Sequence, residues 1–296
     1  MAGHLIYLRR RIKSVKNTQK LTRAMKTVAA AKLRRATTEL KKSRPHRDKI
    51  TFLLRQTASR VELSQKPLLT IRENGGILLV VVASDKGLCG AFNSQVLKQS
   101  ENYYRELLER GEAVSLITIG TKASRYFNKR GLAVKAAYNG LIGRLQFADA
   151  SRLAAELLKF YLHEDVKSIE FAFHEFISAS RQQFTVRRLL PVSGDWFAGP
   201  DVRKEVAAED PTYIFEPGAE AIFEALLPRF ITAAVYQILL QSMAAEQISR
   251  MVAMDLATRN ASDMIRQLTL LLNKMRQAAI TKELLEIITA TEAMNE

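Results

Sequence analysis

The sequence predicts an α/β protein: long N- and C-terminal helices form an antiparallel coiled coil, joined to a small doubly wound α/β middle domain. Glycine and proline are absent from residues 5–42, and glycine is absent from residues 219–296. Most of the 13 glycines and 7 prolines fall between residues 67 and 217, where strand-like apolar runs alternate with helix-like segments. We therefore expect an N-terminal shaft helix over 1–60, a globular α/β domain over 67–205 and a C-terminal shaft helix over 212–296.

The N-terminal segment carries apolar or small residues at steps of three and four. They are Leu5, Leu8, Ile12, Val15, Thr22, Met25, Ala29 and Ala36, interrupted by Gln19 and Lys32. This spacing is typical of one helix face that packs along a partner, and its alanines would let a second helix approach closely. If residues 3–58 are all helical, the helix reaches about 80 Å, more than a single globular core can cover.

The C-terminal segment shows the stronger periodicity. Its apolar, small or amide-bearing residues are Leu226, Phe230, Ala233, Gln237, Leu240, Ala244, Gln247, Met251, Met254, Thr258, Ala261, Ile265, Leu268, Leu272, Met275 and Ala279. A stripe of about seven heptads predicts a coiled coil. Pro228 either starts this helix or kinks one that begins near Pro217. The longer C-terminal helix would project alone beyond the N-terminal one. Two helices folded flat against the middle domain remain the alternative.

The middle domain is predicted to alternate strands and helices. We expect strands at 76–83, 113–119, 168–173 and 183–190, and helices at 92–110, 122–129 and 147–162. The run at 76–83 is continuously apolar, which is typical of a buried strand of a parallel sheet.

The composition excludes several classes of protein and indicates the charge of a partner. A hydrophobic content of 47% excludes a mainly disordered chain, and a single cysteine excludes an intrachain disulfide framework. No run approaches the roughly 18 apolar residues of a membrane span, and the N-terminus lacks a secretory signal. Residues 1–60 hold 18 of the 45 Lys and Arg but only two of the 30 acidic residues. That segment favours an acidic partner such as nucleic acid, lipid headgroups or acidic protein loops.

The sequence shows no convincing site of bond chemistry. The loop at 84–90 (SDKGLCG) lacks the spacing of both common phosphate-binding motifs, and none of the four histidines pairs with another ligand at metal-binding spacing. Ser84, Asp85 and His174 could be drawn as a triad, but no nucleophile elbow surrounds them. Cys89 is expected to be a packed residue and Trp196 a contact residue. The sequence thus predicts no catalytic residue, no cofactor and no metal.

Four separated motifs resemble the gamma subunit of bacterial F-type ATP synthase. They are IKSVKNTQKLTRAMKTVAAAKLRRA at 12–36, SDKGLCGAFN at 84–93, SMAAEQISRMVAMDLATRNASDMI at 242–265 and LNKMRQAAITKELLEIITA at 272–290. They occur in the family's order in a chain of the family's length. The resemblance implies a non-catalytic rotor-stalk subunit that couples rotation of a proton-driven c ring to conformational change in catalytic beta subunits.

The resemblance also implies partner contacts. Met25, Lys26, Glu246, Gln247 and Arg250 match the shaft region that meets the ring of alpha and beta subunits, and Ile280, Leu284 and Ile288 belong to a tip that turns in an apolar sleeve. Tyr213, Phe215 and Glu216 match contacts of the foot with the c ring and the epsilon subunit. The chain departs from the family at Ala290 and Thr291, where Gly-Ala is usual.

Location and alternatives follow from the same motifs. Paired cysteines of the chloroplast type and a transit peptide are not seen, so we expect a peripheral protein on the cytoplasmic side of a bacterial inner membrane, attached through its complex and not a homo-oligomer. A basic coiled-coil protein that binds nucleic acid is the first alternative, and an enzyme that uses the middle domain is the second. Steeply salt-dependent binding to duplex DNA would favour the former, and nucleotide hydrolysis by the isolated chain the latter.

Overall fold

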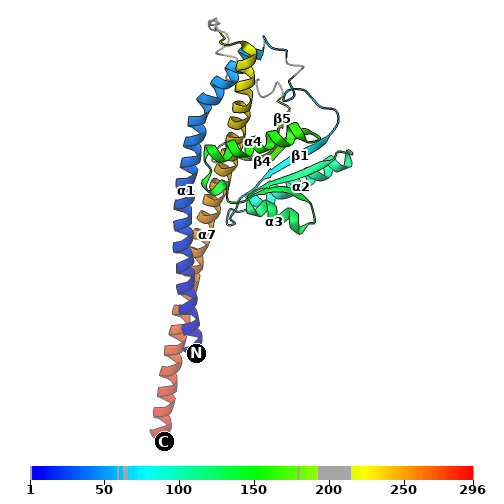
Figure 1. Ribbon diagram of the computed structural model, residues 1–296. Helices are drawn as coiled ribbons and strands as arrows, with labels where there is room; N and C mark the ends of the chain where they lie inside the picture. The colour runs from blue at the N-terminus through cyan, green and yellow to red at the C-terminus, as the bar shows by residue number, and fades with distance from the viewer. Residues whose placement is uncertain (1, 59, 63–65, 179–180, 193–214, 296) are drawn as a thin grey trace. The chain divides into compact units, whose positions relative to one another are not determined.

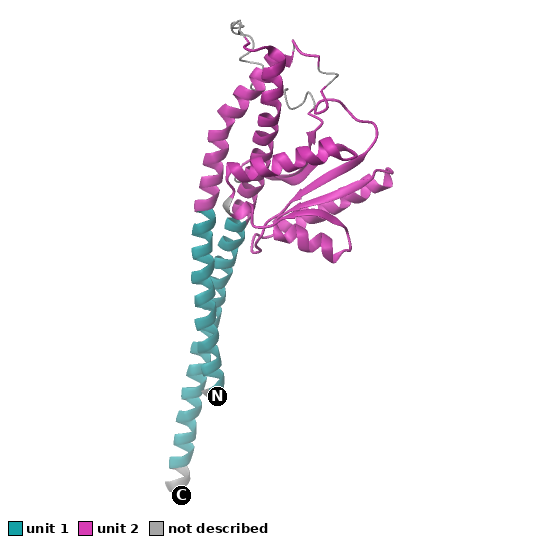
Figure 2. Ribbon diagram, viewed as in Figure 1, with its two compact units in different colours: residues 1–30, 250–296 teal, residues 31–249 magenta. Residues whose placement is uncertain are grey.

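A computed structural model describes residues 2–58, 60–62, 66–178, 181–192 and 215–295. The chain divides into two compact units, residues 1–30 with 250–296 and residues 31–249 (Figure 2). Two long helices contribute to both units: α1 (Ala2–Ala58) and α7 (Ala219–Asn295). The predicted helical ends and α/β middle are confirmed, whereas the three predicted domain ranges stay a prediction.

The first unit is an antiparallel pair made by the N-terminal part of α1 and the C-terminal part of α7 (Figure 1). The predicted apolar face of α1 is buried there at Leu8 and Ala29, which are 2% and 1% exposed. On α7 the predicted positions Met254 and Ala261 are 5% and 8% exposed. The step pattern of three and four therefore identified the packed faces correctly.

The second unit contains a five-stranded sheet in the order β3-β2-β1-β4-β5. Its strands are β1 (Gly76–Val82), β2 (Val114–Ile119), β3 (Val134–Tyr138), β4 (Val166–Phe176) and β5 (Gln182–Leu190). Strands β1 to β4 are parallel to one another, and β5 is antiparallel to β4. The connecting helices are α2 (Phe92–Glu109), α3 (Thr121–Lys129), the short η2 (Ile142–Arg144) and α4 (Phe147–His163). The predicted strand and helix segments are confirmed to within a few residues; β3 and η2 were not predicted.

Each face of the sheet has its own core. Alternate residues of β1 point to opposite faces, with Leu78, Val80 and Val82 in one cluster and Leu79 and Val81 in the other. The helices α2 and α3 cover the second face through buried residues such as Val96 and Phe127. The first face is covered by α4 and by the parts of α1 and α7 that belong to this unit. Both faces being buried explains why β1 is apolar at every position.

From residue 230 to residue 249, the part of α7 in the second unit has no exposed side chain. Phe223, Leu227, Phe230, Val235 and Leu239 are at most 4% exposed and join the core of the first face. This stretch lies within a helix, residues 219–291, whose most apolar 18-residue window has a mean hydropathy of 1.4 and is 50% buried in the protein. The sequence-based exclusion of any span-like segment was too strict, because interspersed Ala, Gln and Ser break a continuous run without lowering the average below that of a span. Packing on the sheet accounts for the apolar composition in a protein core.

Both helices continue through proline. Pro45 lies inside α1 and Pro228 inside α7, which begins nine residues earlier at Ala219. Of the two alternatives, a helix that starts at Pro228 is therefore wrong, and a helix that begins near Pro217 is confirmed. The carbonyl of Pro228 also accepts a hydrogen bond from the Thr232 hydroxyl at 2.9 Å.

Candidate functional surfaces

The loop at residues 84–90 lies where β1 ends, at the edge of the sheet that binds ligands in many doubly wound proteins. Here the chain's own groups fill it. The backbone N–H of Ser84 donates to Asn93 Oδ1 at 3.1 Å, and Asn93 Nδ2 donates to Cys89 Sγ at 3.1 Å. Cys89 is 2% exposed and packs with Phe92 and Ala245, the latter from α7. The loop is built as a packed junction, and the expectation that Cys89 is a packed residue is confirmed.

Asp85 joins this loop to the two neighbouring turns. Its Oδ1 accepts from the N–H and hydroxyl of Thr121, both at 3.1 Å, and from the N–H of Gly140 at 2.7 Å. Gly120, just before Thr121, has a φ of +95°, and a Cβ there would lie 2.1 Å from the carbonyl oxygen of Ala83. This glycine allows the end of β2 to approach β1 closely enough for the Asp85 contacts.

Ser84, Asp85 and His174 do not form a catalytic triad. Neither ring nitrogen of His174 has a hydrogen-bond partner among the residues that the structure describes, although the side chain is 5% exposed. The ring packs instead between Phe92 and Phe184, at centroid distances of 5.3 and 6.2 Å. Burial lowers the pKa of His174 to about 4, so the imidazole is neutral at physiological pH.

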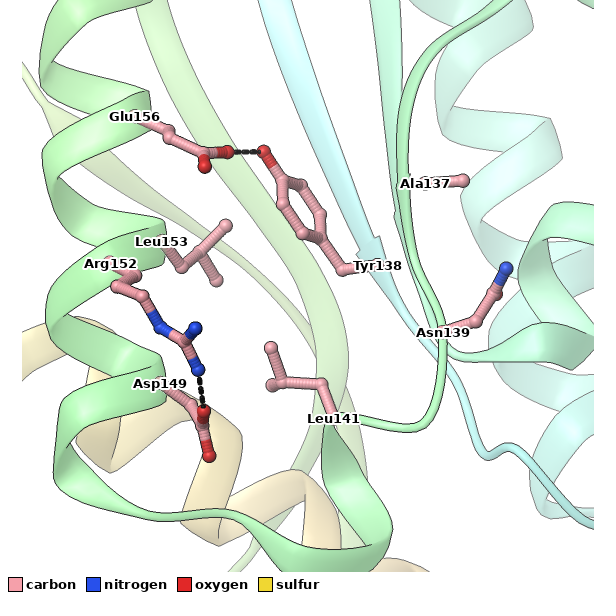
Figure 3. A pocket seen from close by; sticks show the side chains of 8 residues that line it. All are labelled: Ala137, Tyr138, Asn139, Leu141, Asp149, Arg152, Leu153 and Glu156. Carbon is pink, nitrogen blue, oxygen red and sulfur yellow. Dashed lines mark hydrogen bonds and ion pairs between the residues drawn. The ribbon is translucent and has the colours of Figure 1, made fainter.

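A cavity of about 320 Å³ lies between β3 and α4 (Figure 3). Its polar side chains bind one another: the Tyr138 hydroxyl donates to Glu156, and Arg152 pairs with Asp149 at 2.5 Å. Burial, together with the bond to Glu156, raises the pKa of the Tyr138 hydroxyl. A second cavity of about 260 Å³, lined by residues near the start of β1 and β4, holds Tyr103 bonded to Glu170 at 2.6 Å. Because these groups already pair, neither cavity presents a convergent set of polar groups for a ligand.

Of the predicted shaft contacts, Met25 and Lys26 lie on α1 and are half-buried. The ammonium of Lys26 donates to Asp255 Oδ1 at 2.5 Å across the helix pair. This hydrogen bond is the main cause that holds the pKa of the Asp255 carboxyl below its usual range; burial opposes it, and the nearby charge of Arg259 adds to the lowering. Lys26 therefore has a partner within its own chain.

Three other predicted shaft contacts are buried. Glu246 and Gln247 are each 5% exposed and Arg250 is 9% exposed, all on α7. A partner subunit could reach these side chains only at their outer atoms. The periodicity placed Gln247 on the packed face, but nothing in the sequence distinguished Glu246 and Arg250 from exposed polar residues.

The predicted tip residues are exposed. Ile280, Leu284 and Ile288 are 45%, 55% and 52% exposed and recur every fourth residue of α7, so they share one face. Leu285 and Ile287 are also more than half exposed. Exposed apolar residues at this density mark an interaction surface.

The predicted foot contacts are partly described. Tyr213 lies outside the described residues. Phe215 lies 4.9 Å from the guanidinium of Arg60 in a cation–π contact, and Glu216 is exposed. Nearby, Lys66 donates to Glu220 at 2.6 Å and to Glu224 at 2.7 Å, which ties the segment after α1 to the start of α7. The sequence analysis did not predict the ion pairs made by Asp255, or by Lys66 with Glu220 and Glu224. The signal available was the opposite charge of residues on two segments that were predicted to lie side by side.

Comparison with known proteins identifies relatives along nearly the whole chain. The family model for ATP synthase matches residues 4–294. The ATP synthase gamma chain of Geobacter sp. (strain M21) is 41% identical over 292 residues, covering 99% of both chains, and that of Chlorobaculum tepidum is 39% identical over 293 residues, covering 98% of both. A chain of the Tetrahymena thermophila mitochondrial ATP synthase central stalk and c ring is 26% identical, with a TM-score of 0.59 over 80% of this chain and 99% of its own. A chain of the Euglena gracilis mitochondrial ATP synthase has a TM-score of 0.66 at 20% identity over 99% of this chain and 95% of its own, which shows the fold.

Proposed function

This chain belongs to the ATP synthase gamma chain family, and we propose that it is the central rotor-stalk subunit that couples proton-driven rotation of a c ring to ATP synthesis in the catalytic beta subunits. The observation that carries the proposal is the antiparallel helix pair, with α7 continuing past the start of α1, in a chain that aligns with gamma chains over its full length. A shaft needs length and a surface that differs around its circumference, and this pair supplies both.

The coupling follows from differential contact. An asymmetric shaft presents a different surface to each of three surrounding beta subunits, so each rotational position favours a different set of open and closed states. The shaft changes those equilibria only by as much as its contacts differ between the states. The chain itself transmits torque and performs no bond chemistry, and it needs no cofactor or metal. The internally paired loop at residues 84–90 supports that non-catalytic role.

We assign the ring-facing surface to the shaft and tip. Met25 and Lys26 supply half-buried contacts, while Glu246, Gln247 and Arg250 supply outer atoms only. Exposed cations of α1, such as Lys13, Lys16 and Lys20, face acidic loops of the catalytic subunits and give orientation more than affinity. Ile280, Leu284 and Ile288 lie against an apolar sleeve formed by the alpha and beta subunits.

The foot surface is assigned to Tyr213, Phe215 and Glu216, which contact the c ring and the epsilon subunit. The contact of Phe215 with Arg60 and the bonds of Lys66 support a firmly held foot. Association with the membrane is then indirect, through the complex, on the cytoplasmic side of a bacterial inner membrane.

The test is purification of the tagged chain from membranes in mild detergent, followed by native mass measurement. We expect three alpha and three beta subunits to co-purify with ATPase activity, together with epsilon and the c ring. A variant with Ile280, Leu284 and Ile288 changed to Asp should lower ATPase activity or its coupling, whereas the same change at the exposed polar residues Gln277, Thr281 and Asn273 serves as the matched control. Recovery of the chain alone, or with nucleic acid, would overturn the proposal.

A further inference from the structure

The pairing of β4 with β5 continues after the pairing of β4 with β1 has ended. The register of β1 and β4 ends at Val81 and Ala172, whereas β4 and β5 stay paired over residues 174–176 and 182–184. We call these two segments the ribbon. Because two strands alone are only marginally stable in water, the ribbon depends on the elements it packs against.

The ribbon is held on the second unit by few contacts. Phe176 packs on a small apolar cluster that is separate from the two cores of the sheet. The members of this cluster are Cys89, Phe92 and Ala245. The Ser249 hydroxyl of α7 donates to Gln182 Oε1 at 2.8 Å. Segments with so few buried apolar contacts open at a lower free energy than the core of the same protein.

The third contact of the ribbon, His174, carries a cost. Its side chain is 5% exposed and lies between the rings of Phe92 and Phe184, at centroid distances of 5.3 and 6.2 Å. Neither ring nitrogen has a hydrogen-bond partner within the described part of the chain. A buried polar group without a partner loses the hydrogen bonds that it makes in water. Opening the ribbon restores them.

Charged groups near His174 do not compensate for its burial. Titratable groups of the surrounding elements are Asp85, Lys86 and Cys89 in the loop, Lys98 on α2, Glu175 on β4, Arg181 and Arg187 at β5, and Glu246 on α7. None of them is hydrogen-bonded to the described imidazole, and Glu175 pairs with Arg187 at 2.7 Å. Burial lowers the pKa of His174 to about 4. The ring therefore favours water once it takes up a proton.

We propose that the ribbon is an acid-sensitive strap, which opens without unfolding of the sheet and opens more often when His174 is protonated. In the open form, the Cys89 thiol and the side of α7 around Ala245 are uncovered. The junction between the loop at residues 84–90 and α7 is then looser in acid than at neutral pH. This device does not depend on the role of the chain in ATP synthesis.

The thiol of Cys89 reports the opening, because it is the only cysteine of the chain and is 2% exposed. The purified full-length chain is treated with dithiodipyridine, a reagent that reacts with thiols in acid as well as at neutral pH. Its rate of reaction, divided by the rate for the urea-unfolded chain at the same pH, gives the open fraction when opening and closing are fast.

We expect the open fraction to rise about tenfold from pH 7.5 to pH 5.5. The imidazole has a pKa of ~6.5 in water and about 4 in the closed ribbon, so one pH unit below the higher value the proton favours the open form about tenfold. In His174→Phe the rise should be below about twofold. His163→Phe, at an exposed histidine at the end of α4, is the matched control and should keep the tenfold rise.

Ser249→Ala tests the contacts of the ribbon apart from titration. It removes one hydrogen bond and should raise the open fraction about fivefold at either pH, whereas Thr269→Ala, at an exposed position of the same helix, should not. Urea well below the unfolding midpoint should change the open fraction little, because a local opening exposes little surface.

A flat pH profile in the natural chain, or an equal rise in His174→Phe, would overturn the acid-sensitive strap. If His174→Phe does not fold, His174→Gln decides the same point, because it also removes the titrating ring. An open fraction that follows global unfolding in urea, with the same slope, would overturn the local opening.

Discussion

Two stretches of the same helix meet opposite surroundings. Residues 230–249 of α7 are buried or half-buried at every position in the second unit, whereas the described side chains at 280–291 are all exposed. Both stretches are rich in Leu, Ile and Ala. Their composition therefore does not decide their burial; the neighbouring elements do. The first stretch is stabilised by its own chain, and the second is an apolar surface that only a partner can cover.

The largest expected change in the free energy of unfolding comes from a substitution in the buried stretch of α7. Phe230 is 1% exposed in the core of the first sheet face. Phe230→Ala should lower the free energy of unfolding by about 3–5 kcal/mol, from lost transfer free energy and the cavity left behind. Urea denaturation measures this as a lower midpoint at constant slope. Ile287→Ala, at a 62% exposed position, is the matched control and should change it by less than about 0.5 kcal/mol. Equal losses at the two sites would contradict the comparison.

The second prediction concerns the pH dependence of the free energy of unfolding, which reports on the buried side chain of His174. The folded pKa of His174, about 4, lies below the ~6.5 of an unfolded histidine, so the unfolded chain binds more protons between these values. The contribution of His174 to the free energy of unfolding is therefore complete above about pH 6.5 and falls by about 3 kcal/mol as the pH decreases to 4.

The variant His174→Phe isolates this effect, because it keeps the aromatic contacts with Phe92 and Phe184 and removes the titrating group. Urea denaturation of both proteins from pH 7.5 to pH 4 should show a steeper loss for the natural chain, since other groups titrate in both. Parallel pH profiles would mean that the pKa of His174 is the same in the folded and unfolded chains.

Removal of the exposed stretch should have little effect on stability. Among the described side chains, a chain that ends at Ala279 loses only ones that lie in solvent, at a helix end that is marginal by itself. We expect the free energy of unfolding to change by less than about 0.5 kcal/mol, while self-association of the isolated chain, measured by sedimentation velocity, decreases. A loss of more than about 1 kcal/mol would show that the tip packs on its own chain, and a monodisperse full-length chain would contradict the expected self-association.

The smallest effect concerns the exposed side of the helix pair. Lys26→Met removes the main cause of the lowered pKa of Asp255, so that pKa should rise toward its ordinary value. Stability that the pair contributes is present above the unfolded pKa of an aspartate and is lost as the pH falls through the lower, folded one. Carboxyl NMR titration measures the change, with Lys20→Met as control. An unchanged pKa would mean that Arg259 alone maintains it.

The sequence predicted those features that periodicity encodes. Leu8 and Ala29 of α1, and Phe230, Leu240 and Met254 of α7, were placed on packed faces and are buried. The strand β3 was missed because only five residues form it, at the sheet's edge and half-exposed, so it lacks a continuous apolar run. Pro228 was taken as a possible helix start, although α7 begins at Ala219.

Partners across space were harder to predict than positions along the chain. Gln19 was seen as an interruption of an apolar face and Thr258 as a weak position, but only the register of the two helices shows that each has a polar partner. The burial of Glu246 and Arg250 was missed for the same reason, since side-chain surroundings depend on packing that one chain's pattern does not determine. The exposed tip was anticipated because unequal helix lengths follow directly from sequence.

The distance along the chain between paired helix residues has a consequence for biosynthesis. Thr22 and Thr258 touch although they are 236 positions apart in the sequence. At about 5–20 residues per second, the ribosome needs about 10–50 s to deliver the second after the first. During that time α1, strongly basic and without its mate, must stay soluble while the sheet forms beside it. Its density of lysine and arginine thus protects a nascent helix from premature association, well before the finished protein meets any acidic neighbour.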